Sequence, residues 1–358
     1  MALILNDDER ALQESVRRFV TDRSPLTKLR ELMDSGAPFD AELWKQMSAQ
    51  LGLAGLVIPE AHDGAGAGYS ALSVALTELG TNLVASPLVA GALAAGTLLQ
   101  LGDESAQADL LPGLASGELI VSLAALSADG AVTASGDALT GELSPVLNGA
   151  QAGVLLVPAL RDGAPVIFAV SSDAAGLSVI PLTSTDPSRA VATVRLDGTP
   201  GRALSGDAAG ALAFASALAD LALASEQLGA MGACLEMTTE YAKIRIAFGR
   251  PIGSWQGVKH KLADMATAWE LAHALIRDAA RAADERPAEF PAAAAAARVL
   301  TSAPYFEAAS ATIRLHGGIG FTWEHDAHLY YKNAMSGEVL FGTPDDQLDR
   351  LATALAGG

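Results

Sequence analysis

The sequence is poor in several residue types, and each shortage narrows what the protein can be. Cys234 is its only cysteine, which excludes an intrachain disulfide and a metal cluster held by cysteines. Lysine and arginine total 23 against 41 acidic residues, giving a formal net charge of −18. Such a charge opposes binding to nucleic acid or to an anionic membrane. We therefore expect a cytoplasmic protein with neither of these partners, in which any anionic cofactor depends on a few arginines.

The chain also has little that would direct it to a membrane. Its first residues, MALILNDDERALQ, have no basic segment followed by an apolar core, so we expect no secretion signal. The apolar run from Ala85 to Leu101 is too short for a membrane span and is interrupted by one proline and two glycines. We expect this run to form a pair of buried helices.

What is present indicates a globular protein with more than one domain. The chain has 358 residues, half of them hydrophobic, and domains usually contain about 100–200 residues. Apolar residues follow a helical spacing from Asp7 to Phe19 behind a cap at Asn6 or Asp7. Further helical patterns cover Leu43–Leu51, Ser70–Leu79, Val84–Leu101, Ser105–Ala115, Ala208–Arg245, Val258–Asp284 and Ala292–Leu315.

The middle of the chain has a different pattern. Between Leu119 and Asp207, short apolar runs alternate with Asp-Gly and Ser-Asp turn signals, which predicts β-strands. We therefore predict a helical domain over residues 1–118, a β domain over 119–207 and a second helical domain over 208–358. This order lacks the alternating strands and helices of a dinucleotide-binding parallel sheet. The glycines at 64, 66 and 68 are accordingly interpreted as a plain loop rather than a phosphate cradle.

The most informative segment runs from Tyr241 to Gln256 and reads YAKIRIAFGRPIGSWQ. A glycine and a proline end one helical pattern inside it, and another helix follows, so we expect a helix-turn-helix corner. The corner gathers Arg245, Phe248 and Trp255 near a helix N-terminus with free backbone N–H groups. It could bind a pyrophosphate or nucleobase, or it could be a structural turn without a ligand.

This segment resembles the signature of the acyl-CoA dehydrogenase family. In that family an Arg-x-x-Phe-Gly element, followed by an aromatic residue and glutamine, holds the pyrophosphate of FAD across a subunit interface. The resemblance assigns cofactor binding to Arg245, Phe248, Trp255 and Gln256.

A second segment, IRLHGGIGFTWEHD from Ile313 to Asp326, resembles the family's Gln-x-x-Gly-Gly-x-Gly element. The resemblance implies that Gly317, Gly318 and Gly320 let the backbone approach an anion, which a side chain would obstruct. Arg314 stands where the family usually has glutamine, and an arginine could pair with pyrophosphate more strongly.

Weaker agreement in the first third extends the resemblance over nearly the whole chain. It implies an α+β protein with an N-terminal helical domain, a middle β-barrel domain and a C-terminal four-helix bundle. It also implies FAD as cofactor, an acyl-CoA substrate, dimers or dimers of dimers, and transfer of electrons to an electron-transferring flavoprotein. His325 and His328 are spaced as helical metal ligands can be, but no partner cluster accompanies them, so we expect no metal site.

The base that the family uses is missing from its usual place. In the family a carboxylate removes the α-proton of the acyl-CoA while the β-hydrogen leaves as hydride to flavin. The usual base is the glutamate of a Tyr-Glu-Gly-Thr element, where this sequence has Phe341 ahead of Gly342 and Thr343. Phenylalanine cannot accept a proton, although Thr343 is kept as a cofactor contact. Some members carry the base at the position of Asp220, which makes Asp220 a possible substitute and Glu226 a weaker one.

The middle domain departs from the family as well. Ser127 lies in LSADG, where the family has Thr-Glu-Pro, and PVLNG replaces its Trp-x-Thr/Ser-Asn element. By this resemblance, Leu147 lacks the hydroxyl that bonds near flavin N5, and Pro145 lacks the indole that covers the flavin ring. Ser127 retains one hydroxyl.

The retained residues are those that serve a neighbour's FAD, and the lost ones hold the flavin ring and the base. This pattern resembles the subunit without the catalytic glutamate in the α2β2 heterotetrameric acyl-CoA dehydrogenases of actinobacterial sterol catabolism. Our leading hypothesis is a partner subunit that completes the FAD site of a catalytic subunit. The alternatives are a self-sufficient homo-oligomeric dehydrogenase with Asp220 as base, and a scaffold of the same fold without redox activity.

Overall fold

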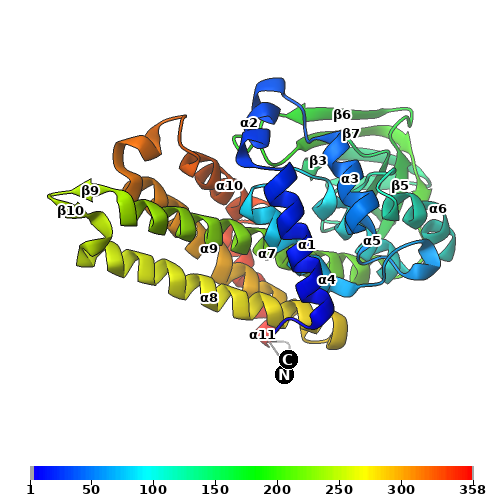
Figure 1. Cartoon of the computed structure of the whole chain (residues 1–358). Coiled ribbons are helices and arrows are strands. Elements are labelled where there is room, and N and C mark those ends of the chain that lie inside the picture. The colour runs from blue at the N-terminus through cyan, green and yellow to red at the C-terminus, as the bar shows by residue number, and fades with distance from the viewer. Residues whose placement is uncertain (1–3, 357–358) are drawn as a thin grey trace. The chain divides into compact units, whose positions relative to one another are not determined.

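The computed structural model describes residues 4–356, and its elements follow the expected order of helices, strands and helices (Figure 1). The α-helices are α1 (Asp7–Arg23), α2 (Leu26–Ser35), α3 (Ala41–Leu51), α4 (Gly68–Thr81), α5 (Leu88–Leu101), α6 (Glu104–Ala115), α7 (Ala208–Ile244), α8 (Gln256–Glu285), α9 (Phe290–His316), α10 (Ala327–Val339) and α11 (Pro344–Ala356). The strands are β1 (Val121–Leu123), β2 (Val132–Ser135), β3 (Ala138–Leu147), β4 (Val154–Arg161), β5 (Ala164–Ser171), β6 (Leu177–Leu182), β7 (Val191–Pro200), β8 (Arg202–Ala203), β9 (Ile246–Ala247) and β10 (Arg250–Pro251). Four 3-10 helices are η1 (Leu53–Gly55), η2 (Glu60–His62), η3 (Ile252–Ser254) and η4 (Gly317–Phe321).

Contacts along the chain define two compact units. The first unit contains the chain up to Glu31, Ser73–Val84 and the chain from Asp220 onward, and the second contains Leu32–Leu72 and Ala85–Ala219. The domain boundaries that we predict after residues 118 and 207 are sequence boundaries, which this grouping by contacts does not test.

A curled sheet forms most of the second unit. Its strands follow the order β6-β7-β3-β2-β4-β5-β8, and β1 pairs with β4. Most neighbours are antiparallel, whereas β1 and β2 each run parallel to β4. Successive side chains of a strand point to opposite faces, so the inward face collects apolar residues in one buried core, which includes Leu139, Leu155, Val157, Phe168 and Val194. The turn signals between short apolar runs therefore predict this sheet correctly.

Helix α5 corrects one expectation from the sequence. We expect two helices between residues 84 and 101, but a single helix begins at Leu88 and ends at Leu101. Pro87 precedes its first residue, where a missing N–H costs no helical hydrogen bond. Gly102, in the left-handed conformation, ends the helix. Most of α5 is buried and apolar residues lie on nearly all of its sides, and neither Pro87 nor the two glycines divide it.

In the first unit, helix α1 is joined to the helical bundle through its first turn. The Asn6 side-chain oxygen accepts a hydrogen bond from the Glu9 backbone N–H at 2.8 Å, and the Glu9 carboxylate accepts one from the Asn6 backbone N–H at 3.0 Å, which forms a capping box. The expected cap is therefore at Asn6. The buried Glu9 carboxylate also pairs with Arg277 at 2.8 Å and with Arg281 at 2.9 Å on α8. One carboxylate thus caps α1 and attaches it to the bundle.

The long helix α7 is the centre of this bundle. Two glycines allow it to cross α4 closely: a Cβ on Gly80 would lie 2.0 Å from the Glu226 carbonyl oxygen, and one on Gly229 would lie 1.9 Å from that of Thr77. Helix α7 is long and apolar enough to span a membrane by length and composition. However, 72% of its most apolar 18-residue window is buried inside the structure, which is typical of a core helix.

Candidate functional site

The segment after α7 forms a tight hairpin at one end of the bundle (Figure 1). Strands β9 and β10 pair in antiparallel fashion, and the two residues between them, Phe248 and Gly249, have φ of +54° and +80°. Two successive positive φ values are typical of a type I′ hairpin turn. A phenylalanine there is strained, and its side chain is 94% exposed. The sequence predicts a helix-turn-helix corner at this point; in the structure a short hairpin that presents Phe248 joins the two helices.

The other predicted residues of this segment surround the hairpin. Arg245 directly follows α7, and its amide bonds to the Tyr241 carbonyl at 2.9 Å, so it continues the helical path. The Arg250 guanidinium lies 3.5 Å from the centre of the Trp255 ring, and Phe248 meets the same ring edge-on at 6.2 Å. Gln256 is the first residue of α8, whose N-terminus has no side-chain cap. Exposed cations and free amides at a helix start together form a suitable site for an anion.

The glycine segment follows the end of α9. Gly317 has φ of +64° and ψ of −140°, a conformation that favours glycine. A Cβ on Gly320 would lie 2.6 Å from the Ile313 carbonyl oxygen, so Gly320 is required by packing. A Cβ on Gly318 would meet nothing within 4 Å, so the space beside Gly318 is open to a ligand. Arg314 is exposed and forms a surface ion pair with Glu307, with 3.7 Å between its guanidinium and the carboxylate.

The structure brings these two segments together. The rings of Tyr241 and His316 stack with centroids 4.3 Å apart, and the Tyr241 hydroxyl donates to the His316 carbonyl at 3.3 Å. Arg245 therefore lies one turn beyond a residue that contacts the glycine segment directly. The two segments, whose contacting residues Tyr241 and His316 are 75 positions apart in the chain, meet at the same end of the bundle.

The turn that carries Phe341 lies elsewhere in the same unit and is fixed by buried side chains. Arg298 donates to the carbonyls of Gly337 and Leu340. It also bonds Gln227 on α7 at 2.9 Å, and Gln227 precedes Tyr241 by 14 residues, or about 21 Å along a helix. The turn at Phe341 is thus well separated along α7 from the hairpin.

More side chains hold the backbone around Phe341. Gln347 donates to the carbonyls of Glu338 and Gly342, each at 3.0 Å, and Arg350 donates to the carbonyl of Phe341 at 3.2 Å. Phe341 itself has φ of +64°, which is strained for a bulky residue. Thr343 bonds Asp346 through its amide and hydroxyl and so caps α11 rather than pointing freely to a ligand.

Asp220 belongs to this same network. Its side chain is 3% exposed, and its Oδ1 lies 3.0 Å from Arg350 Nη2 and 3.8 Å from Arg298 Nε. Burial raises the pKa of Asp220, and the two guanidinium groups oppose that rise. A carboxylate between two arginines is positioned as their counter-ion. The geometry therefore favours a structural role for Asp220, and its role as a base stays a prediction.

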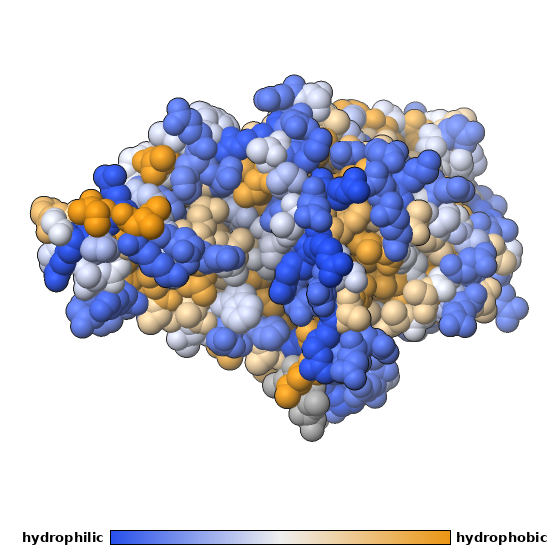
Figure 2. All heavy atoms as spheres, viewed as in Figure 1, coloured by the Kyte–Doolittle hydropathy of each residue, from blue (hydrophilic) through white to orange (hydrophobic). Residues whose placement is uncertain are grey.

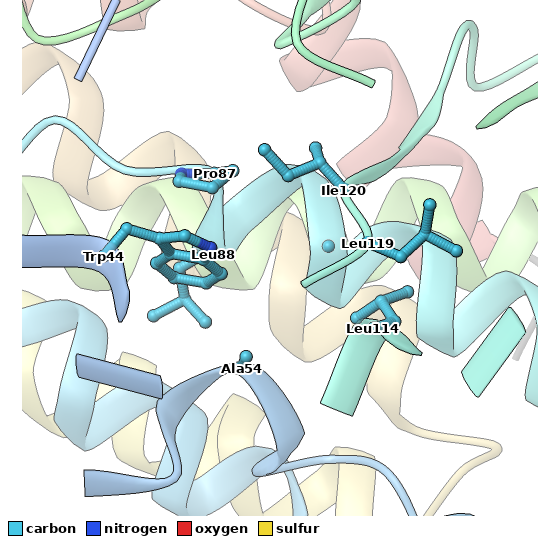
Figure 3. A pocket seen from close by; sticks show the side chains of 8 residues that line it. Trp44, Ala54, Pro87, Leu88, Leu114, Leu119 and Ile120 are labelled. Atoms are coloured by element: carbon cyan, nitrogen blue, oxygen red, sulfur yellow. The ribbon is translucent and has the colours of Figure 1, made fainter. Parts of the chain in front are cut away.

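In the second unit, the positions that replace the family's flavin contacts offer little to a ligand. Leu147 is buried, and its carbonyl accepts a hydrogen bond from the Ser122 hydroxyl at 2.6 Å. Pro145 and Ser127 are exposed, and the Ser127 hydroxyl turns to Asp129 at 3.4 Å. A hollow lined by Trp44, Leu88, Leu119 and other apolar side chains, of about 230 Å³ including space open to solvent, also lies in this unit (Figure 3). The Trp44 indole N–H is already bonded to the Gly117 carbonyl, so the residues that line this hollow offer no free polar side chain to orient a substrate.

Neither histidine that we weighed as a metal ligand stands in a metal-binding group. His325 accepts from the Ala327 amide at 3.1 Å, and the His328 ring meets Trp323 edge-on at 4.8 Å. Within residues 4–356, no three His, Cys, Asp or Glu side chains are grouped so that they could hold a metal ion.

Comparison with known proteins identifies the family. Residues 6–118 match the family model described as "Acyl-CoA dehydrogenase, N-terminal domain", and residues 217–356 match "Acyl-CoA dehydrogenase, C-terminal domain". The acyl-CoA dehydrogenase IpdE2 of Mycobacterium tuberculosis is 34% identical over 349 residues, which cover 96% of each chain. The chain belongs to the acyl-CoA dehydrogenase family, and the predicted fold class is confirmed.

Two solved structures are similar over nearly their whole length. One is the ChsE4-ChsE5 complex from Mycobacterium tuberculosis, with a TM-score of 0.92, 29% identity and complete coverage of both chains. The other is a variant of the Tcur3481-Tcur3483 steroid ACAD, with a TM-score of 0.89, 31% identity and 98% coverage of each chain.

Proposed function

We propose that this chain is a subunit of an FAD-dependent acyl-CoA dehydrogenase, and that it completes the FAD site of a homologous catalytic subunit. One contrast carries the proposal. The chain presents its arginine hairpin and glycine segment at an exposed end of the bundle, whereas the position of the family's base holds Phe341, whose turn is fixed by hydrogen bonds from the buried Arg298 and the partly buried Arg350. The chain thus retains what another subunit can use and lacks what its own chemistry would need.

The surface at that end of the bundle supports a protein partner. Large apolar side chains are exposed on the hairpin, where they form the hydrophobic tip in Figure 2, and on the glycine segment, where Phe321 is 77% and Trp323 66% exposed. Exposed apolar patches of this kind usually mark interaction sites. Arg245 and Arg250 place two positive charges at this hairpin, although the chain as a whole is strongly acidic. A partner that covers the hairpin should therefore place an anion against these two arginines.

The residues present fit the pyrophosphate of FAD. Arg245 and the free amides at the start of α8 would pair with its charges, and the open backbone at Gly318 would admit its oxygens. FAD supplies the hydride acceptor of the dehydrogenation when it is bound. The homologous subunit would hold the flavin ring and provide the carboxylate that removes the α-proton.

The relatives bear on the substrate class and the assembly, and the electron acceptor is proposed from the resemblance to the family. The similar solved structures are a two-component complex and a steroid ACAD, which supports a heterotetramer acting on steroid-derived or fatty acyl-CoA thioesters. Electrons would pass to an electron-transferring flavoprotein. A self-sufficient enzyme would need Asp220 as base, but its two arginine partners stabilise the ionised carboxylate and hold it in place. A redox-inactive scaffold would not need the arginine hairpin.

The proposal predicts which subunit carries the base. We would co-express the chain with a homologous subunit that has an intact Tyr-Glu-Gly-Thr element and follow flavin bleaching by steroid-derived acyl-CoA without oxygen. Changing that element's glutamate to glutamine should slow reduction by about 10²–10⁴-fold, the usual contribution of a general base. The matched variant Phe341→Gly, which suits the positive φ, should change the rate by less than about twofold. Rapid flavin reduction by this chain alone would contradict the proposal.

A further inference from the structure

Three aromatic rings pack in a column, one pair stacked and the next tilted, at the end of the bundle where the two motifs meet. Tyr241 is in the last turn of α7, His316 ends α9, and His325 lies in the turn before α10. The ring centroids of Tyr241 and His316 are 4.3 Å apart with an interplanar angle of 29°. Those of His316 and His325 are also 4.3 Å apart, with an angle of 50°. Three chain segments are thus joined by one column of rings, which we call the Tyr241 stack.

Backbone hydrogen bonds orient every ring in the Tyr241 stack. His316 is 3% exposed, and its Nδ1 lies 2.7 Å from the Thr312 carbonyl, so this nitrogen carries the proton as the donor. His325 uses its Nδ1 as acceptor for the Ala327 amide. Burial lowers the pKa of both histidines, and each lowering favours the neutral ring that stacks without charge repulsion. The rings therefore have one defined arrangement.

The turn that carries His325 is itself anchored. Arg30 pairs with Asp326 at 2.6 Å and donates to the Trp323 carbonyl at 2.6 Å. The last ring of the stack consequently rests on a turn that is held from both sides of His325. A stack attached at its far end can act as a fixed support for the segments at its near end.

Tyr241, the first ring of the stack, contacts both parts of the proposed pyrophosphate site, which are the glycine segment and the arginine hairpin. The Tyr241 hydroxyl bonds to the carbonyl of His316, which directly precedes Gly317. The Tyr241 carbonyl accepts the amide of Arg245. One residue thus contacts the glycine segment through its side chain and the arginine hairpin through its backbone. A shift of Tyr241 would move the two halves relative to each other.

We infer that the Tyr241 stack is a positioning device that fixes the backbone of Gly317 and Gly318 relative to Arg245, so that both can bind one pyrophosphate. The inference rests on the proposed function and deepens it. The two histidines and the tyrosine are positioning residues, because they act through the arginine and the glycines rather than on the cofactor. Their effect should appear in the affinity for FAD.

The test separates ring stacking from general stability. Tyr241→Leu and His325→Ala each remove a ring, whereas Tyr241→Phe and His325→Phe keep one. His273→Ala is the matched control, since His273 is half-buried in the same bundle and stacks on Trp269 at 5.2 Å, on α8. The heteromer would be freed of flavin and titrated with FAD, with the dissociation constant read from flavin fluorescence and Tm measured for every variant.

Loss of a ring should raise the FAD dissociation constant about tenfold or more, since misplacement on the order of an ångström is costly. The phenylalanine variants should stay within about threefold of the parent, and His273→Ala should leave the constant unchanged whatever its Tm. If ring loss affects FAD no more than His273→Ala does, the inference is wrong. Arg245→Ala in the same titration separates the two levels: if it weakens FAD while the stack variants do not, only this inference fails, and if it too has no effect, the proposed function fails.

Discussion

Replacing Asp220 with asparagine is expected to lower the free energy of unfolding by about 3–5 kcal/mol, the usual cost of removing one partner from a buried ion pair. Arg298 is fully buried and would lose the negative charge that lies 3.8 Å from its Nε. The cost of the substitution comes from leaving a buried guanidinium without the carboxylate beside it, whatever the intact Asp220–Arg298 pair contributes to stability. Urea unfolding of the purified chain at neutral pH would measure it.

The control for this prediction is an exposed ion pair in the sheet. Glu142→Gln removes a partner of Arg195 at a pair more than half exposed on each side, and should cost less than about 1 kcal/mol. If Asp220→Asn keeps its stability while the heteromer loses flavin reduction, then Asp220 is a base and the self-sufficient alternative gains support.

Replacing Arg245 with alanine is expected to weaken FAD binding by the heteromer about tenfold to a hundredfold, because hydrogen bonds to charged groups contribute about 1.5–3 kcal/mol. Arg245 is exposed, so the Tm of the isolated chain should not change. The effect should also shrink as salt is added, since an exposed charge pair is screened. FAD titration at low and high ionic strength measures both expectations.

Arg195→Ala provides the matched control, because it removes another exposed arginine from the same chain but from the sheet. Its FAD affinity should equal that of the parent at either salt concentration. An Arg245→Ala heteromer that binds FAD as tightly as the parent would show that the hairpin does not serve the cofactor.

Much of the fold follows from patterns that operate over short stretches of sequence. Helical spacing places α7 and α8 to within about two residues, and turn signals indicate the sheet, because both depend on neighbouring residues. The short helix α2 was not predicted, although Leu26, Leu29 and Met33 follow a helical spacing within its ten residues. The supposed helix pair was wrong because Pro87 begins a helix rather than breaking one.

In the candidate site too, the sequence predicts what is contiguous and misses what folding brings together. The arginine and glycine segments are contiguous motifs, so the sequence locates them, although their use by FAD stays a prediction. The network around Asp220 could not be found, because Arg298, Arg350 and Gln347 are scattered on two helices and meet only after folding. The same holds for the Tyr241 stack.

The most direct test of the central claim is the FAD content and mass of the chain expressed alone and with a homologous catalytic subunit, measured by absorbance and light scattering. Our account predicts little or no FAD on the chain alone, and a heterotetramer with one FAD for each pair of unlike subunits after co-expression. A homotetramer of this chain with one FAD per protomer would contradict it, and would direct attention back to Asp220 as the base.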